Sequence, residues 1–226
     1  MLSSGTLNSP PIWHILTRLG EAEILIPAAG LTMVALMAQS QTRKLALNWM
    51  MLIVVATLLT LASKVAFIGW GLGWTEIDFT GVSGHAMFAA AIYPVLMSTV
   101  FSGASRGSRW LPVALGSALA LMVAVSRISV GAHSVSEVVA GLIIGGSVSA
   151  GALALSEACA SVIRPAVPIL LLAWFSIAPF EMPASHTHSF VTRLALTVSG
   201  HETPFTRSRF MRHVLHSPPA AARRLS

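Results

Sequence analysis

The chain has 226 residues, of which 54% are hydrophobic and only 10% are charged, and its mean hydropathy is +0.75. This composition excludes a soluble globular domain and predicts an integral membrane protein. Most of the formal net charge of +6 lies in the C-terminal segment 183–226, which holds six arginines and a single acidic residue, Glu202.

The N-terminal segment, 1–21, does not resemble a cleaved signal peptide. Residues 1–11 are polar, lack a basic stretch and are not followed by a short apolar region with a cleavage site. We therefore expect the first hydrophobic helix to direct membrane insertion. The stretch 11–20, with Trp13, His14 and Arg18, is typical of a short interfacial helix held by aromatic and basic residues.

The central segment, 22–182, predicts an all-α, polytopic bundle of transmembrane helices. A spanning helix needs about 20 largely apolar residues. Divided at its charged and Gly/Pro clusters, the chain offers six such stretches, near 22–40, 45–68, 84–102, 110–126, 135–157 and 162–180. In the fifth stretch, Gly141, Gly145 and Ser149 form a stripe of small residues that indicates close packing between helices.

Positive charges in the short loops predict the orientation of the bundle. They lie on alternate turns of the chain, and hence on one side, at Arg43, Lys44, Arg106, Arg109 and Arg164. By the positive-inside rule this side faces the cytoplasm, so the intervening loops face outward. We expect a multi-pass protein of a bacterial inner membrane whose polar clusters face the periplasm or exterior.

The basic tail, 183–226, is predicted to be largely disordered. With six crossings the tail lies outside, against its charge, whereas five or seven crossings would place it inside. Three of its histidines, His186, His188 and His201, could bind a metal, but a solvated tail lying on anionic lipid is the favoured interpretation.

Two cations and a helix start are expected to form an anion site at the outer face. Lys64 and Arg127 lie near the ends of the second and fourth predicted helices, and two fixed cations suit a phosphate group. Ser83 is a plausible N-cap of the third helix, whose free N–H groups would point at the same place. His85, in the first turn, could then donate a proton. Taken alone, Lys64 and Arg127 could instead be interfacial anchors, and His85 a helix-end residue.

His133 and Glu137 are four residues apart at the start of the fifth predicted helix, so they share one face. A carboxylate can hold one imidazole nitrogen while the other faces substrate, which suits histidine as a nucleophile. The sequence Ser134-x-x-Glu137 also fits a capping box, in which Glu137 only satisfies the helix start. Both roles could hold together.

These residues resemble the type 2 phosphatidic acid phosphatases, a family related in its site to vanadium haloperoxidases and acid phosphatases. That family carries Lys-x6-Arg-Pro, Pro-Ser-Gly-His and Ser-Arg-x5-His-x3-Asp motifs. The second motif is similar to Ser83-Gly84-His85, and the third, with the same spacing, to Ser126, Arg127, His133 and Glu137. The resemblance covers residues from about 60 to 150.

The resemblance implies a role for each matching residue. Phosphate would be bound by Lys64, Ser83, Gly84, Ser126 and Arg127, while His85 would be the general acid and base, His133 the nucleophile and Glu137 its orienting partner. It also implies an all-helical core, and hydrolysis of lipid phosphates or diphosphates, such as phosphatidate or undecaprenyl diphosphate, without a metal or other cofactor. Partners would be this lipid substrate and the membrane lipids, not nucleic acid.

The chain departs from the family pattern at four positions. Gly71 and Leu72 stand where the first motif has arginine and proline, Val82 precedes Ser83 in place of proline, and Glu137 replaces aspartate. The missing arginine leaves open a lipid-phosphate-binding pseudoenzyme, and a transporter or structural membrane protein is a third alternative. Glu76 and Asp78, in a Gly/Trp-rich outer loop, are better explained by an interfacial lid than by a metal site.

Overall fold

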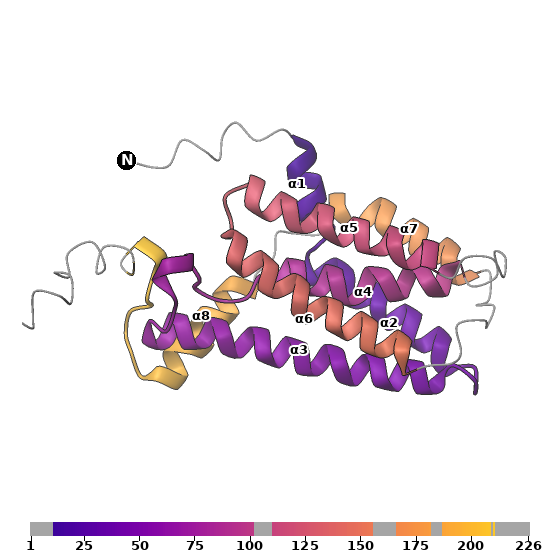
Figure 1. The fold of residues 1–226 in the computed structure, drawn as a ribbon, viewed down its shortest axis with the longest axis horizontal. Coiled ribbons are helices and arrows are strands. Elements are labelled where there is room, and N and C mark those ends of the chain that lie inside the picture. The colour runs from indigo at the N-terminus through magenta and orange to yellow at the C-terminus, as the bar shows by residue number, and fades with distance from the viewer. Residues whose placement is uncertain (1–10, 102–109, 156–165, 182–186, 209, 211–226) are drawn as a thin grey trace, which may run out of the picture. The chain divides into compact units, whose positions relative to one another are not determined.

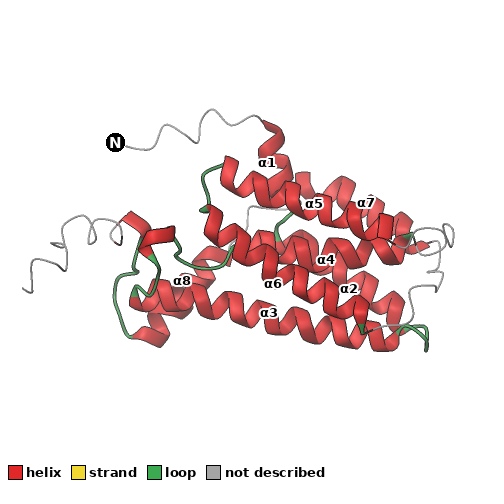
Figure 2. Cartoon of the chain, in the orientation of Figure 1, coloured by secondary structure: helices red, strands yellow, loops and turns green. Residues whose placement is uncertain are grey.

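The computed structural model describes residues 11–101, 110–155, 166–181, 187–208 and 210. Within these ranges the chain is helical, as predicted, and the ribbon shows no strands (Figure 2). The helices are α1 (Pro11–Arg18), α2 (Ala22–Met37), α3 (Arg43–Trp70), α4 (Gly84–Val100), α5 (Trp110–Ser129), α6 (Val135–Ala154), α7 (Ala166–Glu181) and α8 (Thr187–Ser199), with a short 3-10 turn, η1, at Thr75–Ile77 (Figure 1).

The chain divides into two compact units. The first comprises Met1–Thr60 and Val82–Ser185, and the second comprises Leu61–Gly81 and His186–Ser226. The expected division, into a 1–21 segment, a 22–182 domain and a 183–226 tail, therefore differs from the observed one. The N-terminal segment belongs to the first unit because α1 packs against α5.

Helix α4 lies at the centre of the first unit and packs against α2, α5 and α6 (Figure 1). Glycines allow this close approach. A Cβ atom at Gly116 of α5 would lie 2.5 Å from the carbonyl oxygen of Tyr93, and one at Gly141 of α6 would lie 2.6 Å from that of Ser83. A Cβ atom at Gly145 would collide with the carbonyl oxygen of Met87. The predicted packing role of the small-residue stripe is confirmed.

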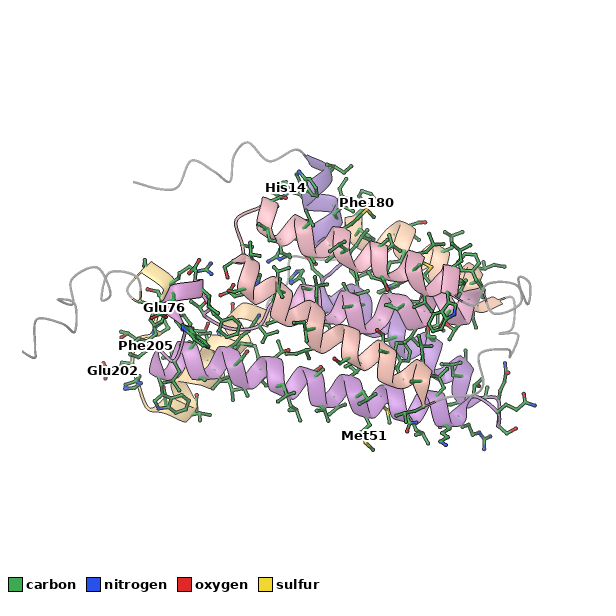
Figure 3. The ribbon with its side chains drawn as sticks, viewed as in Figure 1. His14, Met51, Glu76, Phe180, Glu202 and Phe205 are labelled. Atoms are coloured by element: carbon green, nitrogen blue, oxygen red, sulfur yellow. The ribbon has the colours of Figure 1, made fainter. Side chains whose placement is uncertain are left out.

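Indole hydrogen bonds tie the outer helices of the first unit to its centre. Trp49 of α3 donates its Nε1–H to the carbonyl oxygen of Ala91 on α4 at 2.9 Å. Trp174 of α7 donates to the carbonyl oxygen of Ile24 on α2, also at 2.9 Å. Large apolar side chains instead cover the outside, and Met51 and Phe180, which are 67% and 71% exposed, point away from the helices (Figure 3). Such a surface suits contact with lipid.

Each of the six predicted apolar stretches corresponds to a helix, but six crossings are not confirmed. In the described part of the chain, three helices are long and apolar enough to span a membrane, namely α3, α5 and α6. A fourth span is obtained if α1 and α2, which meet at a 47° bend, count as one. Helices α2, α4 and α7 have 16, 17 and 16 residues, somewhat fewer than the roughly 20 that cross a bilayer core.

The prediction of a disordered tail is wrong for residues 187–208. Helix α8 forms there, and Val191 and Ala195 pack with Phe67 and Ile68 in the core of the second unit. The chain after α8 returns to α3, where the Phe205 N–H donates to the carbonyl oxygen of Ile68 at 2.9 Å. Arginine content suggested a solvated tail, whereas its interspersed apolar residues provide enough buried surface to order it. Of the tail histidines that could bind a metal, His186 lies outside the described residues.

Candidate active site

The loop between α5 and α6 brings His133 back to Arg127. Gly131 turns the chain with a φ of 68°, a conformation that glycine adopts without strain. The N–H groups of Ala132 and His133 then donate to the carbonyl oxygen of Arg127, at 3.0 and 3.3 Å. The spacing of five residues between Arg127 and His133 is therefore the length of one closed turn.

His133 and Glu137 form the contact that their spacing predicts. The Nδ1 atom of His133 lies 2.7 Å from Oε2 of Glu137. The side chain of Glu137 is only 2% exposed, and that of His133 is 16% exposed. Because an ionised carboxylate can only accept, Nδ1 carries the hydrogen, and the neutral ring has its lone pair on Nε2. This tautomer is the one that a nucleophilic or basic Nε2 requires.

The capping-box alternative is also confirmed, and it does not compete with the histidine contact. The Glu137 N–H donates to Oγ of Ser134 at 3.4 Å, and the Ser134 N–H donates to Oε2 of Glu137 at 3.3 Å. Oε2 therefore accepts from both the imidazole and a backbone amide. The cap fixes Glu137, and Glu137 in turn fixes the imidazole.

The start of α4 is joined directly to this cluster. Ser83 occupies the N-cap position, as predicted, and its N–H donates to the backbone carbonyl of Glu137 at 3.1 Å. The side chain of Ser83 makes no capping bond. Gly84 and His85 begin the first turn, so the N-terminal end of α4 lies beside the start of α6.

Side-chain donors of Ser83 and Arg127 are buried and have no hydrogen-bond partner among the described residues. They are Oγ of Ser83, whose residue is fully buried, and Nε of Arg127. Buried polar groups are nearly always paired, because an unpaired one costs about 1–3 kcal/mol. A hydroxyl and a guanidinium Nε–H that lack an acceptor, close to a helix N-terminus, together suit an anion with several oxygens.

Ser126 does not fit its predicted phosphate-binding role. It is fully buried, and its hydroxyl donates to the carbonyl oxygen of Val123 at 2.6 Å. The same Oγ lies 2.8 Å from Oγ1 of Thr17 on α1. The hydroxyl of Ser126 therefore holds α1 on α5, next to Arg127.

The turn after α1, at Leu19 and Gly20, packs against this site, and the sequence did not predict this contact. Tyr93 of α4 donates its hydroxyl hydrogen to the carbonyl oxygen of Leu19 at 2.8 Å. A Cβ atom at Gly20 would collide with Val123 and would lie 3.2 Å from Cβ of His85. The backbone of the turn thus lies directly on His85. A lone glycine in a short N-terminal helix gives no signal of such a contact.

Glu21 adds a buried carboxylate to this turn. It lies in the turn between α1 and α2 and is 8% exposed, and its Oε2 has no hydrogen-bond partner within the described ranges. Burial raises the pKa of Glu21, and the nearby charges of Arg18 and Arg127 act in the opposite direction. One carboxylate therefore lies within electrostatic reach of two guanidinium groups.

Comparison with known proteins agrees with these motifs. The family model of the PAP2 superfamily matches residues 11–161. The chain belongs to the PAP2 superfamily. It is also 35% identical over 211 residues to a Klebsiella pneumoniae protein named "Uncharacterized 22.5 kDa protein in cps region", an alignment that covers 87% of this chain and 96% of that protein. No solved structure matches the chain. With this family and these apolar helices, the chain is a membrane protein.

The first PAP2 motif lies in the second unit. Lys64 is on the C-terminal part of α3, where its Cγ would lie 3.3 Å from a Cβ atom at Gly81. Its contact with phosphate stays a prediction, because the other motif residues belong to the first unit.

Gly71, at the position of the family arginine, has a φ of +70°, and a Cβ atom there would lie 2.8 Å from the ring of Phe205. Both the backbone conformation and the packing exclude a side chain at this position.

No group of three or more His, Cys, Asp or Glu side chains in the described parts of this PAP2 chain is arranged to hold a metal ion. Of the two loop acids, Asp78 accepts from Nε of Arg207 at 3.0 Å. Its backbone carbonyl accepts from Nη2 of the same arginine at 3.1 Å. This pair fastens the outer loop to the chain after α8.

Proposed function

We propose that this PAP2 protein is a membrane phosphatase that hydrolyses a lipid phosphate or diphosphate through a phosphohistidine intermediate. The observation that carries the proposal is the 2.7 Å contact between His133 and Glu137 beside the buried, unpartnered donors of Ser83 and Arg127. An oriented imidazole and an anion site are the two parts that a histidine nucleophile needs.

In the first step, Nε2 of His133 attacks the phosphorus atom and the bond from phosphorus to the leaving oxygen breaks. His85 donates a proton to that oxygen, so the lipid alcohol or lipid monophosphate leaves neutralised. Ser83, the Gly84 amide and Arg127 bind the phosphoryl oxygens, where negative charge is spread in the transition state. Lys64 would add a further positive charge. Glu137 stabilises the positive charge that develops on the attacking ring.

In the second step, water attacks the phosphorus atom of phosphohistidine. His85 accepts the proton of the water, the bond between phosphorus and Nε2 breaks, and inorganic phosphate is released. The ring of His133 returns to its starting tautomer, with Nδ1–H on Glu137. Because the hydrolysis is divided into two displacements, the imidazole of His85 can act as the acid in the first step and as the base in the second.

The apolar helices fit a substrate that stays in the membrane. Positive charges on the opposite loops favour an outward-facing site, so a lipid headgroup in the outer leaflet would reach Arg127 and His133 while its acyl or prenyl chains remain in lipid. Exposed apolar side chains on α5 and α6, such as Leu121 and Ile143, offer a surface for those chains.

The test is phosphate release from a panel of lipid phosphates by the full-length protein purified in detergent, with a metal chelator present. We expect turnover of at least one lipid phosphate or diphosphate by the wild type, and its loss in His133→Ala. If the wild type binds orthovanadate but hydrolyses nothing in the panel, the protein is a lipid-phosphate-binding pseudoenzyme and the proposal is wrong. Turnover that His133→Ala leaves unchanged would also contradict it.

A further inference from the structure

Helix α1 ends with a half-buried arginine. Arg18 is the last residue of α1, and its Nε is buried. The residue before it, Thr17, contacts Ser126, which directly precedes Arg127 on α5. The two residues after it, Leu19 and Gly20, contact α4 through Tyr93 and His85. The chain on both sides of Arg18 is thus fixed to the two helices that carry the candidate phosphate-binding residues.

Glu21 lies within electrostatic reach of both Arg18 and Arg127. Burial raises the pKa of its carboxyl, the charges of Arg18 and Arg127 lower it, and the charge of Glu23 raises it. Two guanidinium groups repel each other in a low-dielectric site, and nearby carboxylates offset that repulsion. The carboxylates of Glu21 and Glu23 therefore allow two cations to lie in this part of the first unit.

We propose that Arg18 is a phosphate-binding residue whose guanidinium group, with that of Arg127, forms a two-armed clamp on the phosphoryl group of the substrate. This inference rests on the proposed function, because it takes the site at Ser83 and Arg127 as the phosphate site. It adds a residue from outside the three family motifs. Arg18 would give the first unit a second guanidinium in a chain that has Gly71 at the position of the family arginine.

The clamp also explains why the turn at Gly20 is so closely packed. Glycine lets the backbone lie against His85 and Val123, and this brings the preceding arginine to the helix ends. In this chain, α1 is therefore part of the site as well as a membrane-surface helix.

Equilibrium binding of orthovanadate to the full-length protein in detergent tests the clamp without relying on turnover. We expect Arg18→Met, which keeps most of the buried stem, to raise the Kd by about 10- to 150-fold, which is the ~1.5–3 kcal/mol of a charge-assisted hydrogen bond at 1.4 kcal/mol per tenfold change. Arg18→Lys keeps the positive charge but loses the planar guanidinium group. Its Kd for orthovanadate should therefore lie between those of Arg18→Met and the wild type.

Arg43→Ala is the matched control. Arg43 is an exposed arginine at the start of α3 that donates to the carbonyl oxygen of Met37 at 3.0 Å, and its loss should leave the Kd unchanged. If Arg18→Met melts at a lower temperature but binds orthovanadate like the wild type, Arg18 is structural and the inference is overturned.

The clamp and the proposed function can fail separately. If the wild type hydrolyses lipid phosphate and neither Arg18→Met nor Arg18→Lys raises the Kd for orthovanadate or the KM for the lipid, only the clamp is wrong. If the wild type binds orthovanadate with an Arg18-dependent Kd but turns nothing over, the clamp stands and the phosphatase is wrong. If the wild type neither binds orthovanadate nor releases phosphate from any lipid in the panel, both are wrong.

Discussion

Glu137 has two roles at one oxygen atom, and substitution can separate them. Ser134→Ala removes the N-cap acceptor of α6 but leaves the contact between His133 and Glu137, so we expect a loss of about 1 kcal/mol in stability and nearly unchanged turnover. Glu137→Gln keeps the size of the side chain and removes the charge that holds the imidazole. We expect it to lower kcat by roughly 10²–10⁴-fold.

Melting temperatures and kcat for these two variants, measured in the same detergent, check this prediction. Equal losses of kcat in Ser134→Ala and Glu137→Gln would mean that Glu137 serves only as a capping residue. The contact between His133 and Glu137 could be predicted from the sequence, because residues four apart at the start of a helix lie on the same face.

The same reasoning could not find Arg18 or Glu21. Arg127, whose charge acts on Glu21, lies more than 100 positions away on α5, and the packing of α1 on α5 brings the two parts of the chain together. Nor could the sequence distinguish Ser126 from Ser83. Both are serines next to a charged or histidine-containing motif, but one hydroxyl is held by Val123 and Thr17, and the other has no described partner.

At the scale of elements, the packing of α6 on α4 depends on which glycine faces the neighbour. A Cβ atom at Gly145 would meet the backbone of Met87 and the side chain of Ala90, whereas one at the adjacent Gly146 would meet nothing within 4 Å. We expect Gly145→Ala to destabilise the protein by about 1–3 kcal/mol. Gly146→Ala should be neutral or stabilise by up to about 1 kcal/mol, because alanine favours helix.

Thermal melting of the two variants provides the comparison, and turnover provides a second one. Because α6 carries His133 and Glu137 at its start, displacement of α6 by Gly145→Ala should also lower kcat. Equal melting temperatures for the two variants would show that α6 does not pack on α4 through Gly145.

The loop after α3 explains the departure from the first family motif. We expect Gly71→Arg, which restores the family residue, to lower the melting temperature and not to raise turnover. The left-handed conformation alone costs a non-glycine residue about 1–2 kcal/mol, and contact with Phe205 adds to this.

Gly200→Arg is the matched control for that substitution. Gly200 has a φ of +71° with nothing within 4 Å of its Cβ position. A side chain there would therefore introduce backbone strain but no clash with a neighbour. A gain in turnover for Gly71→Arg, or a larger loss of stability for Gly200→Arg, would contradict the packing explanation. Sequence reasoning identified the missing arginine, but it could not identify Phe205, because the return of the tail to α3 is a tertiary contact.

At the scale of the whole molecule, the apolar stretches could be predicted and their number of crossings could not. Composition and hydropathy decide that a stretch is helical and lipid-compatible. Whether 16 or 17 residues cross the bilayer depends on tilt and on neighbouring helices. For the tail, the charge predicted disorder, but the apolar residues between the arginines pack α8 against the end of α3.

The orientation that the positive loops predict can be tested with single cysteines. In a Cys159→Ser background, we expect Ala132→Cys, in the exposed loop after α5, to react with a membrane-impermeant maleimide added to intact spheroplasts. Gln41→Cys, in the exposed turn before α3, should react only after permeabilisation. The reverse pattern would place the site in the cytoplasm.

The central claim is that His133 is the nucleophile, and trapping the covalent intermediate tests it most directly. Protein incubated with ³²P-labelled lipid phosphate and quenched in alkali, where phosphohistidine survives, should carry label on the peptide that contains His133. The label should be absent from His133→Ala and present in Arg43→Ala. Label on another residue, or turnover without any label in a protein whose His133→Ala variant remains active, would contradict the account.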